Sequence, residues 1–383
     1  MSDLKKVLGA LALVCLTSCG GPVAAGFSGS PTGVPHLMAT PQATQTLTPN
    51  LTPTAAPAAT PTPTPRPTPA PAANPSPNAT PASPLEHVRP GSPAYVAVSV
   101  ATGWRSPAVV RSIDVPALAN PVQVRQWLAR MTLAERADLI GRADTQVLLG
   151  ERVEVLGLTG NWAQVVVPGQ RTTIDPRGYP VWIPIGQLSA IAPAEAATVA
   201  TVKVPTTWLL TAAGVATLEV SFGTSLPVLA GGGTNLELSL PGRRSLFADA
   251  AAVSVRARDA SPLSRDAASI IGTARRFLGL PYLWAGTSAY GLDCSGLVYA
   301  VYRAHGILLP RDADNQAMAG RAVARAALQP GDLVFFATNG YVHHVAIYTG
   351  NGQILDSPRT GGAVEVIPLA TYSDYAGARR ILP

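Results

Sequence analysis

The chain has 383 residues, a formal net charge of +6 at pH 7, and only three cysteines, Cys15, Cys19 and Cys294. An exported protein that relies on disulfides carries an even set of cysteines in its folded part, so this composition excludes a disulfide-stabilised scaffold. The part of the chain after about residue 90 is long enough for two or three domains, which hydrophobic cores must stabilise.

The amino terminus has the pattern of an export signal. Two lysines precede an apolar run, Val7–Leu16, that is too short to span a bilayer comfortably. We therefore predict a signal peptide over residues 1–18. The run ends in Leu-Thr-Ser-Cys at 16–19, which resembles the lipobox of bacterial lipoproteins, and this implies lipidation of Cys19. An ordinary secretory signal with an incidental cysteine is the alternative.

Residues 19–90 are expected to form a stalk after the lipidated cysteine. From Gly20 to Pro84 the only charged side chain is Arg66, and Pro, Thr and Ala dominate the composition. Such a segment cannot bury a core, and its proline density favours extended polyproline II. We predict a disordered but semi-rigid spacer that carries the folded part away from the membrane.

The next segment, residues 91–192, has the periodicity of short strands. Residues 95–100 alternate as a strand, and further strands are expected at Arg152–Leu156 and Trp162–Val167. Together with a returning strand at Gly178–Pro184, these strands resemble a bacterial SH3-like barrel. A second barrel of this kind is predicted over residues 195–258, with its strands between Thr198 and Val255.

A helical insertion interrupts the first barrel. Asn120 and Pro121 supply a cap and a first-turn proline for a helix that runs through Met131. Thr132 and Glu135 have the spacing of a capping box and predict a second helix.

Cys294 lies at the predicted start of a helix in the last segment, residues 262–383. A first helix is expected over Ala267–Leu278, and a turn-rich stretch then leads to Asp-Cys-Ser-Gly at 293–296. The following apolar residues recur at helical spacing until Gly306. With Asp293 as the cap, the unpaired N–H groups and the helix dipole favour a thiolate at Cys294. A buried structural cysteine is the alternative.

A thiolate nucleophile needs a base that later protonates the leaving group, and histidine suits this role at neutral pH. His305 lies at the end of the cysteine helix, where we expect it to cap carbonyl groups. Residues 341–348 alternate as a strand, which places His343 on the face of Val345, and His344 with Ala346 on the other. The small Ala346 leaves room for the cysteine helix, so His344 is predicted as the base. Adjacent strand histidines point to opposite faces, so no metal site is expected.

The last segment contains four motifs, which in chain order read Asp293-Cys-Ser-Gly296, Pro310-Arg-Asp-Ala313, Pro330-Gly-Asp-Leu-Val-Phe-Phe336 and His344-Val-Ala-Ile-Tyr348. In this order they resemble the NlpC family of papain-like cysteine peptidases of bacterial walls, and the resemblance covers residues 267–383. Upstream, the stretches at 101–107, 116–121 and 178–180 are similar to the first SH3-like domain of the γ-D-glutamyl-L-diamino-acid endopeptidases. The fold class this implies is α+β, with a papain-like catalytic domain preceded by two small all-β barrels.

The resemblance assigns roles to residues around the nucleophile. It implies that Cys294 is the nucleophile and His344 the base, and that the hydroxyl of Tyr282 helps to hold the oxyanion. From the sequence alone Tyr282 would be assigned to the core. The same resemblance places Asp293 and Ser295 in the lining of the pocket.

Other positions match the family's substrate contacts or depart from them. Asp312 matches an acidic residue directed at the free amine of the substrate, and Arg311 suits the α-carboxylate of D-glutamate, although a surface salt bridge is equally consistent. Asp144, where the family usually has glutamate, and Tyr179 match a pair that binds the amine of L-alanine; a solvated carboxylate is the alternative for Asp144. Asp356 stands where the third catalytic residue is usually histidine, and it can accept the second imidazole N–H.

These observations predict a hydrolase that cleaves the γ-D-glutamyl–L-diamino acid bond of murein peptides with a free amino-terminal L-alanine. The alternatives are a general peptidoglycan endopeptidase that acts on intact wall stems, and a non-catalytic wall-binding lipoprotein helped by its positive charge. No cofactor and no nucleic-acid partner are expected. We expect a monomer, exported and held by lipid at the outer face of the cytoplasmic membrane or of another cell-envelope membrane.

Overall fold

The computed structural model describes residues 87–260 and 263–383, all of which belong to one compact unit, Ser76–Pro383. The predicted signal peptide, Cys19 and nearly all of the stalk lie outside the described residues. Within the described ranges, no helix combines the length and the apolar character needed to cross a membrane.

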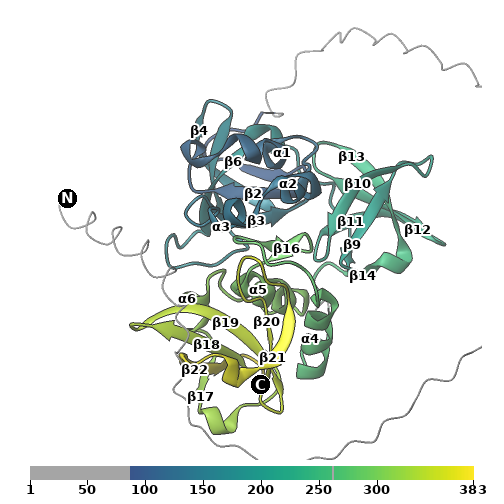
Figure 1. The fold of residues 1–383 in the computed structure, drawn as a ribbon. Helices are drawn as coiled ribbons and strands as arrows, with labels where there is room; N and C mark the ends of the chain where they lie inside the picture. Colours follow the sequence, from purple (N-terminus) through teal and green to yellow (C-terminus); the bar gives the residue numbers. More distant parts are fainter. Residues whose placement is uncertain (1–86, 261–262) are drawn as a thin grey trace, which may run out of the picture. The chain divides into compact units, whose positions relative to one another are not determined.

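The first described segment forms a seven-stranded antiparallel sheet in the order β3-β2-β6-β5-β4-β1-β7 (Figure 1). The prediction of one strand over residues 95–100 is wrong, because the chain bends after Val96. Its first half pairs with β4 and β7, and its second half pairs with β3 and β6. The strands are β1 Pro93–Val96, β2 Val100–Trp104, β3 Ala143–Leu148, β4 Arg152–Thr159, β5 Trp162–Val167, β6 Tyr179–Pro184 and β7 Leu188–Ser189.

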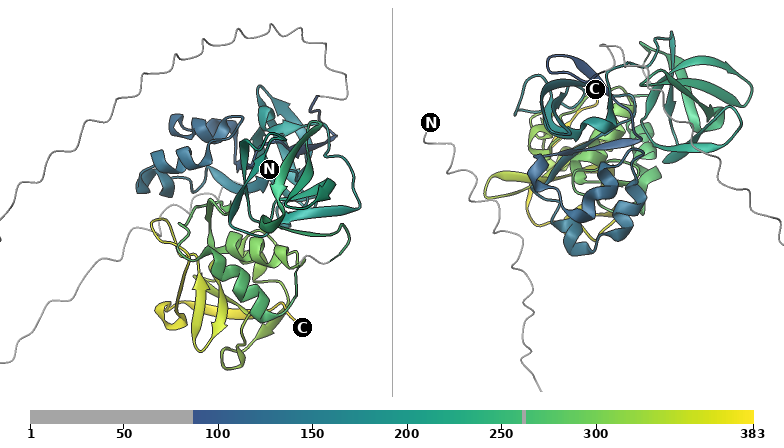
Figure 2. Two further views of the ribbon diagram at one scale, coloured as in Figure 1. Left: turned by 90° about the vertical axis from the view of Figure 1, so that its right-hand side faces the viewer. Right: turned by 90° about the horizontal axis from the view of Figure 1, so that it is seen from above.

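Three short helices follow β2, namely α1 Val115–Leu118, α2 Val124–Arg130 and α3 Leu133–Ala137. Figure 2 shows them, in blue, gathered beside the first sheet. The prediction that Asn120 and Pro121 begin a helix is wrong: α2 starts at Val124, and the Asn120 side chain donates to the Gly186 carbonyl instead. The capping box of α3 is confirmed, since Thr132 and Glu135 each bond the other's backbone N–H.

The second segment forms another seven-stranded antiparallel sheet, in the order β10-β9-β13-β12-β11-β8-β14. Its strands span the range expected from the sequence. The SH3-like classification of this sheet and of the first one stays a prediction. The strands are β8 Thr198–Val202, β9 Thr206–Leu210, β10 Ala216–Ser221, β11 Ser225–Gly232, β12 Asn235–Leu240, β13 Arg244–Asp249 and β14 Val253–Ala257.

The last segment combines three helices with a six-stranded sheet in the order β17-β22-β18-β19-β20-β21. The helices are α4 Ala267–Ala274, which continues as a 3-10 turn to Phe277, α5 Cys294–Ala304 and α6 Ala313–Gln316. The sheet strands are β17 Arg321–Val323, β18 Leu333–Thr338, β19 Tyr341–Gly350, β20 Gln353–Asp356, β21 Glu365–Pro368 and β22 Tyr375–Arg380; a small ribbon pairs β15 Thr287–Ser288 with β16 Gly291–Leu292.

Helix α5 packs on one face of this sheet, beside β19 (Figure 1). Leu297, Val298 and Val301 of the helix share a buried cluster with Val345 and Ile347. Ala346 lies on the other face, in a separate cluster with Phe336. The expectation that the helix packs on the face of Ala346 is therefore wrong, because the larger apolar side chains of β19 form the helix contact.

Candidate active site

Cys294 is the first residue of α5, as the sequence predicts. The Asp293 side chain caps the helix by accepting from the Gly296 N–H at 2.6 Å. A side chain at position 296 would clash with the Gly286 carbonyl, so glycine permits this close approach. The thiol is buried, with 8% of the residue exposed, and the positive end of the helix dipole favours its ionised form.

His344 on β19 lies between Cys294 and a buried carboxylate. Its Nε2 is 2.8 Å from Oδ1 of Asp356 on β20, which leaves Nδ1 for the thiol. Burial lowers the pKa of His344, but the neighbouring Cys294 and the hydrogen bonds to Asp356 and Cys294 outweigh it and raise the pKa to about 10. An imidazolium beside a thiolate is the state that these contacts stabilise.

Asp356 is fully buried and fixes the imidazole from behind. Its Oδ2 accepts from the Tyr372 hydroxyl at 2.6 Å, and Tyr372 also stacks against the His344 ring at 5.2 Å between centroids. Phe336 lies against both rings. Tyr372 was not identified from the sequence, because it belongs to no recognised motif and becomes a neighbour of His344 only through the fold.

The other two histidines of this segment are engaged elsewhere. His343 is exposed and lies 2.8 Å from Asp374, at a register shift in the β18–β19 pairing that breaks the alternation of faces. The prediction that it shares the face of Val345 is therefore wrong. His305 is the C-cap residue of α5, as expected, and its backbone N–H donates to the Tyr302 and Arg303 carbonyls, while its ring contacts the Ser264 carbonyl and the Thr273 hydroxyl.

Tyr282 is buried beside Cys294. Burial, with the nearby Cys294 and Asp293, raises its pKa well above the ordinary tyrosine value. The phenol therefore stays protonated at neutral pH and remains a hydrogen-bond donor. A donor in this place has the chemistry that a developing oxyanion requires.

Arg311 is fully buried, so the alternative of a surface salt bridge is wrong. Its guanidinium pairs with both carboxylate oxygens of Asp293, at 2.6 and 3.1 Å, and donates to the Ser295 hydroxyl at 2.9 Å. Its Nε donates to the Thr145 hydroxyl at 2.9 Å. Most donors of Arg311 thus stabilise the residues that start α5, and few remain for a substrate carboxylate.

Thr145 connects the first sheet to this network. Its hydroxyl accepts from Arg311 and donates to the Gln170 side chain at 2.6 Å, while Gln170 in turn donates to the Gln146 carbonyl. The Gln146 side chain accepts from the Ser288 hydroxyl at 2.7 Å. These residues are buried and were not identified from the sequence, where isolated Thr and Gln residues carry no distinctive pattern.

Asp144, Tyr179 and Asp312 form what we call the acidic corner. Burial raises the pKa of Asp312 to about 6, although Arg311 and a hydrogen bond from Tyr179 oppose this. The Tyr179 phenol is also mostly buried, and its pKa is raised, by burial first and then by Asp312 and Asp144. Asp144 carries a contact that the sequence did not indicate, an ion pair with Arg105 at 2.7 Å. Much of its charge is therefore already balanced.

Metal ligands do not gather in the described part of the chain: no group of three or more His, Cys, Asp or Glu side chains there is arranged to hold an ion.

Comparison with known proteins identifies relatives that this chain matches over nearly their whole length. The chain is 40% identical over 306 residues to a γ-D-glutamyl-L-lysine dipeptidyl-peptidase of Bacillus cereus, covering 76% of this chain and 92% of that protein. A Bacillus subtilis protein of the same name is 39% identical over 279 residues, covering 71% of this chain and 92% of its own length.

A solved structure is also similar. A crystal structure of an NlpC/P60 family protein from Bacillus cereus superposes with a TM-score of 0.72 at 39% identity, covering 76% of this chain and all of that one. Residues 279–378 match the NlpC/P60 family, and they include Cys294, His344 and Asp356. The chain therefore belongs to the NlpC/P60 family, with the papain-like fold and the cysteine peptidase activity of that family.

Proposed function

We propose that this peptidase cleaves the γ-D-glutamyl–L-diamino acid bond of murein peptides that have a free amino-terminal L-alanine. The names of the two Bacillus relatives support this bond, because both are γ-D-glutamyl-L-lysine dipeptidyl-peptidases and both match over 92% of their length. The observation that carries the free-amine requirement is the acidic corner, where Tyr179 of the first sheet meets the partly buried Asp312.

The proposed reaction has two steps. The Cys294 thiolate attacks the γ-carbonyl carbon of D-glutamate, and Tyr282 with the Cys294 backbone N–H stabilises the oxyanion. The intermediate collapses to a thioester as the His344 imidazolium gives its proton to the departing amine of the diamino acid. Neutral His344 then takes a proton from water, which attacks the thioester, and the dipeptide leaves with its γ-carboxyl restored. Asp356 orients the imidazole and stabilises its charged form throughout.

The acidic corner offers an electrostatic reason for specificity. A substrate ammonium beside Asp312 forms a charge-assisted hydrogen bond, whereas an acylated nitrogen that covers this partly buried carboxylate leaves it desolvated and unpaired, at a cost of about 1–3 kcal/mol. Free peptides are favoured over stems whose alanine is blocked by attachment to glycan.

The structure favours neither of the two alternative functions, a general peptidoglycan endopeptidase or a non-catalytic wall-binding protein. A general endopeptidase for intact stems gains nothing from an acidic corner at the alanine end. A non-catalytic wall-binding protein has no need for a thiol at the start of a helix, paired with a buried His344 and Asp356. The monomeric state and the lipid anchor at Cys19, on an envelope membrane, remain part of the proposal and rest on the sequence alone.

Mass spectrometry of the products tests the proposal. Purified protein is incubated with L-Ala-γ-D-Glu-L-Lys, with the same peptide acetylated at the amino terminus, and with intact wall sacculi, and Cys294→Ala serves as the control. We expect L-Ala-D-Glu and lysine from the free peptide alone. Equal release from the acetylated peptide would contradict the free-amine requirement, and cleavage at another bond would contradict the assigned reaction.

A further inference from the structure

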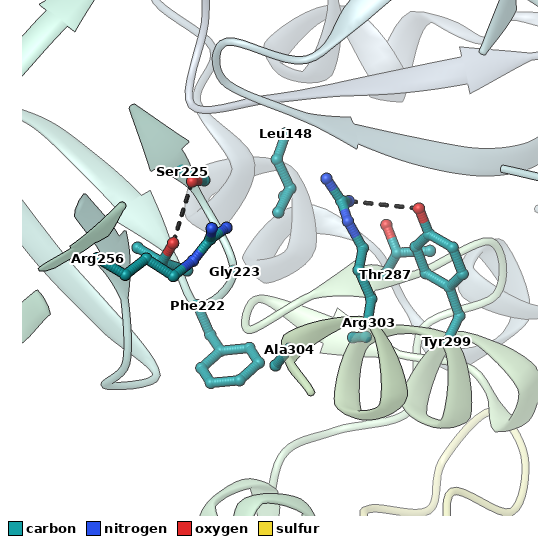
Figure 3. Close-up of a pocket in the computed structure, with 11 residues that line it drawn as sticks. Leu148, Phe222, Gly223, Ser225, Arg256, Thr287, Tyr299, Arg303 and Ala304 are labelled. Carbon is teal, nitrogen blue, oxygen red and sulfur yellow. Dashed lines mark hydrogen bonds between the residues drawn. The ribbon is translucent and has the colours of Figure 1, made fainter. Parts of the chain in front are cut away.

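A cavity of about 110 Å³ lies away from the active site, where the first sheet, the second sheet and α5 meet. Figure 3 shows Arg256 of β14 and Arg303 of α5 extending their guanidinium groups from opposite sides toward Leu148. The helix contributes Tyr299, Ala300, Arg303 and Ala304. Ala300 is six residues after Cys294, about 9 Å along the helix axis, so the cavity is separate from the reaction centre.

Arg256 lines this cavity and has an unpaired hydrogen-bonding edge. Its Nη1 is anchored by the backbone carbonyls of residues 257, 258 and 260, the last two at 2.8 Å. Its Nε is buried and has no hydrogen-bond partner, and within the described residues the hydrogen bonds of the Arg256 side chain all come from Nη1. The Nε and Nη2 donors form the edge of a guanidinium that binds a carboxylate through two parallel hydrogen bonds.

The charges around the cavity favour an anion. Glu151 pairs with Arg303 and balances that guanidinium. Arg256 has no carboxylate partner in the described ranges, and Lys203 lines a small adjoining hollow that shares Arg256 as a wall. The local excess of positive charge is only partly exposed to solvent, so an anion here would meet less screening than on the open surface.

The remaining walls narrow the class of ligand. Leu148, Phe222, Ala300 and Ala304 are apolar, while the Thr201 and Ser225 hydroxyls already bond each other. A phosphate would turn several charged oxygens toward apolar walls without partners. We propose that this cavity binds a small carboxylate that carries a short apolar substituent, with its two oxygens on the Nε and Nη2 atoms of Arg256.

Matched ligands test this assignment by isothermal titration on the full chain. N-acetylalanine and N-acetylalaninamide have nearly the same size and differ in the carboxylate. We expect the acid to bind with a Kd of about 1 mM, as suits a ligand of its size, and the amide to bind at least about tenfold more weakly. The acid should bind equally well after Cys294 is alkylated, because the cavity lies outside the active site.

Two variants probe the cavity from opposite sides. Arg256→Lys keeps the charge but lacks the two-nitrogen edge, and we expect it to weaken binding of the acid about tenfold. Ala300→Leu fills the cavity from α5 and should also weaken binding while leaving Arg256 in place. Arg244→Gln, at an exposed arginine of the second sheet that does not line the cavity, is the control and should bind like the unmodified protein.

The opposite results would overturn the proposal. They are no measurable binding of the acid, equal binding of the amide, tighter binding of inorganic phosphate than of the acid, or unchanged binding in folded Arg256→Lys and Ala300→Leu proteins. Thermal unfolding of each variant, measured alongside, establishes that loss of binding occurs in a folded chain.

Discussion

The reaction centre and the acidic corner differ in how the chain assembles them. The proposed reaction centre joins Cys294, His344 and Asp356 from α5, β19 and β20, all within one segment. The acidic corner joins Asp312 to Tyr179 and Asp144, which the first sheet supplies from far upstream. The geometry of a centre built from one segment is determined by the packing of that segment, whereas the geometry of the acidic corner depends on the contact between two segments.

The largest expected effect is at Cys294, the proposed nucleophile. Cys294→Ala should reduce kcat/KM by about 10⁴-fold or more, because no other group can form the thioester. The fold should persist, since a helix-start thiol replaced by methyl leaves little cavity, and we expect a Tm within a few degrees of the unmodified protein. Turnover assays and thermal unfolding measure both quantities. Retained turnover would refute the proposed mechanism.

The next largest effect is expected at His344, and the loss of activity should distinguish it from the adjacent His343. His344→Ala should lower kcat/KM by about 10³-fold or more, because the variant loses both the pairing of the thiolate and the proton donor for the leaving amine. His343→Ala removes only an exposed contact to Asp374 and should keep most of the activity. Equal losses would show that His343 has a catalytic role.

The pH profile of kcat/KM gives a further check on His344. With its pKa raised to about 10, the imidazolium persists at neutral pH and loses its proton as the pH rises through 10. Activity should therefore fall on the alkaline side near that value, because the leaving amine then lacks its acid.

At the acidic corner we expect Asp312→Asn to reduce kcat/KM for the free peptide by about 10- to 100-fold and to leave the acetylated peptide nearly unchanged. The unmodified protein should show the same loss as the pH falls through about 6, because protonation removes the Asp312 charge. In Asp312→Asn, the preference for the free peptide over the acetylated peptide should no longer change as the pH falls through 6. If its preference still followed pH in the same way, another group would have to be the amine-binding carboxylate.

Thr145 tests how far the reaction centre depends on the first sheet. Thr145→Val leaves Arg311 Nε and the side-chain oxygen of Gln170 without a buried partner, at a cost of about 1–3 kcal/mol. We expect kcat/KM to fall about tenfold and the rate of Cys294 alkylation to change with it, since Arg311 fixes the cap of α5. Thr145→Ser keeps the hydroxyl and should restore both. A loss of stability alone, with normal alkylation, would limit Thr145 to a structural role.

The sequence predicted those features of the fold and of the site that local patterns determine. The Asp293 cap, the helix start at Cys294 and the capping box at Thr132 depend on residues a few positions apart, and the structure contains all three. Strand alternation failed at His343, because a register shift alters the pairing with β18. Tyr372, Thr145 and Arg105 were missed because each acts through a contact that only the tertiary fold creates.

The smallest expected effect, at Asp144, shows whether the corner depends on one carboxylate or on two. Arg105 lies 2.7 Å from Asp144 and retains about half of its side chain exposed, so the Asp144 charge is both balanced and partly screened. We therefore expect Asp144→Asn to lower kcat/KM for the free peptide only about two- to threefold, much less than Asp312→Asn. Arg105→Gln is the matched control: it frees the Asp144 carboxylate and should strengthen the preference for the free amine. A loss in Asp144→Asn as large as in Asp312→Asn would mean that a bound ammonium displaces Arg105, and the amine would then lie between the two carboxylates.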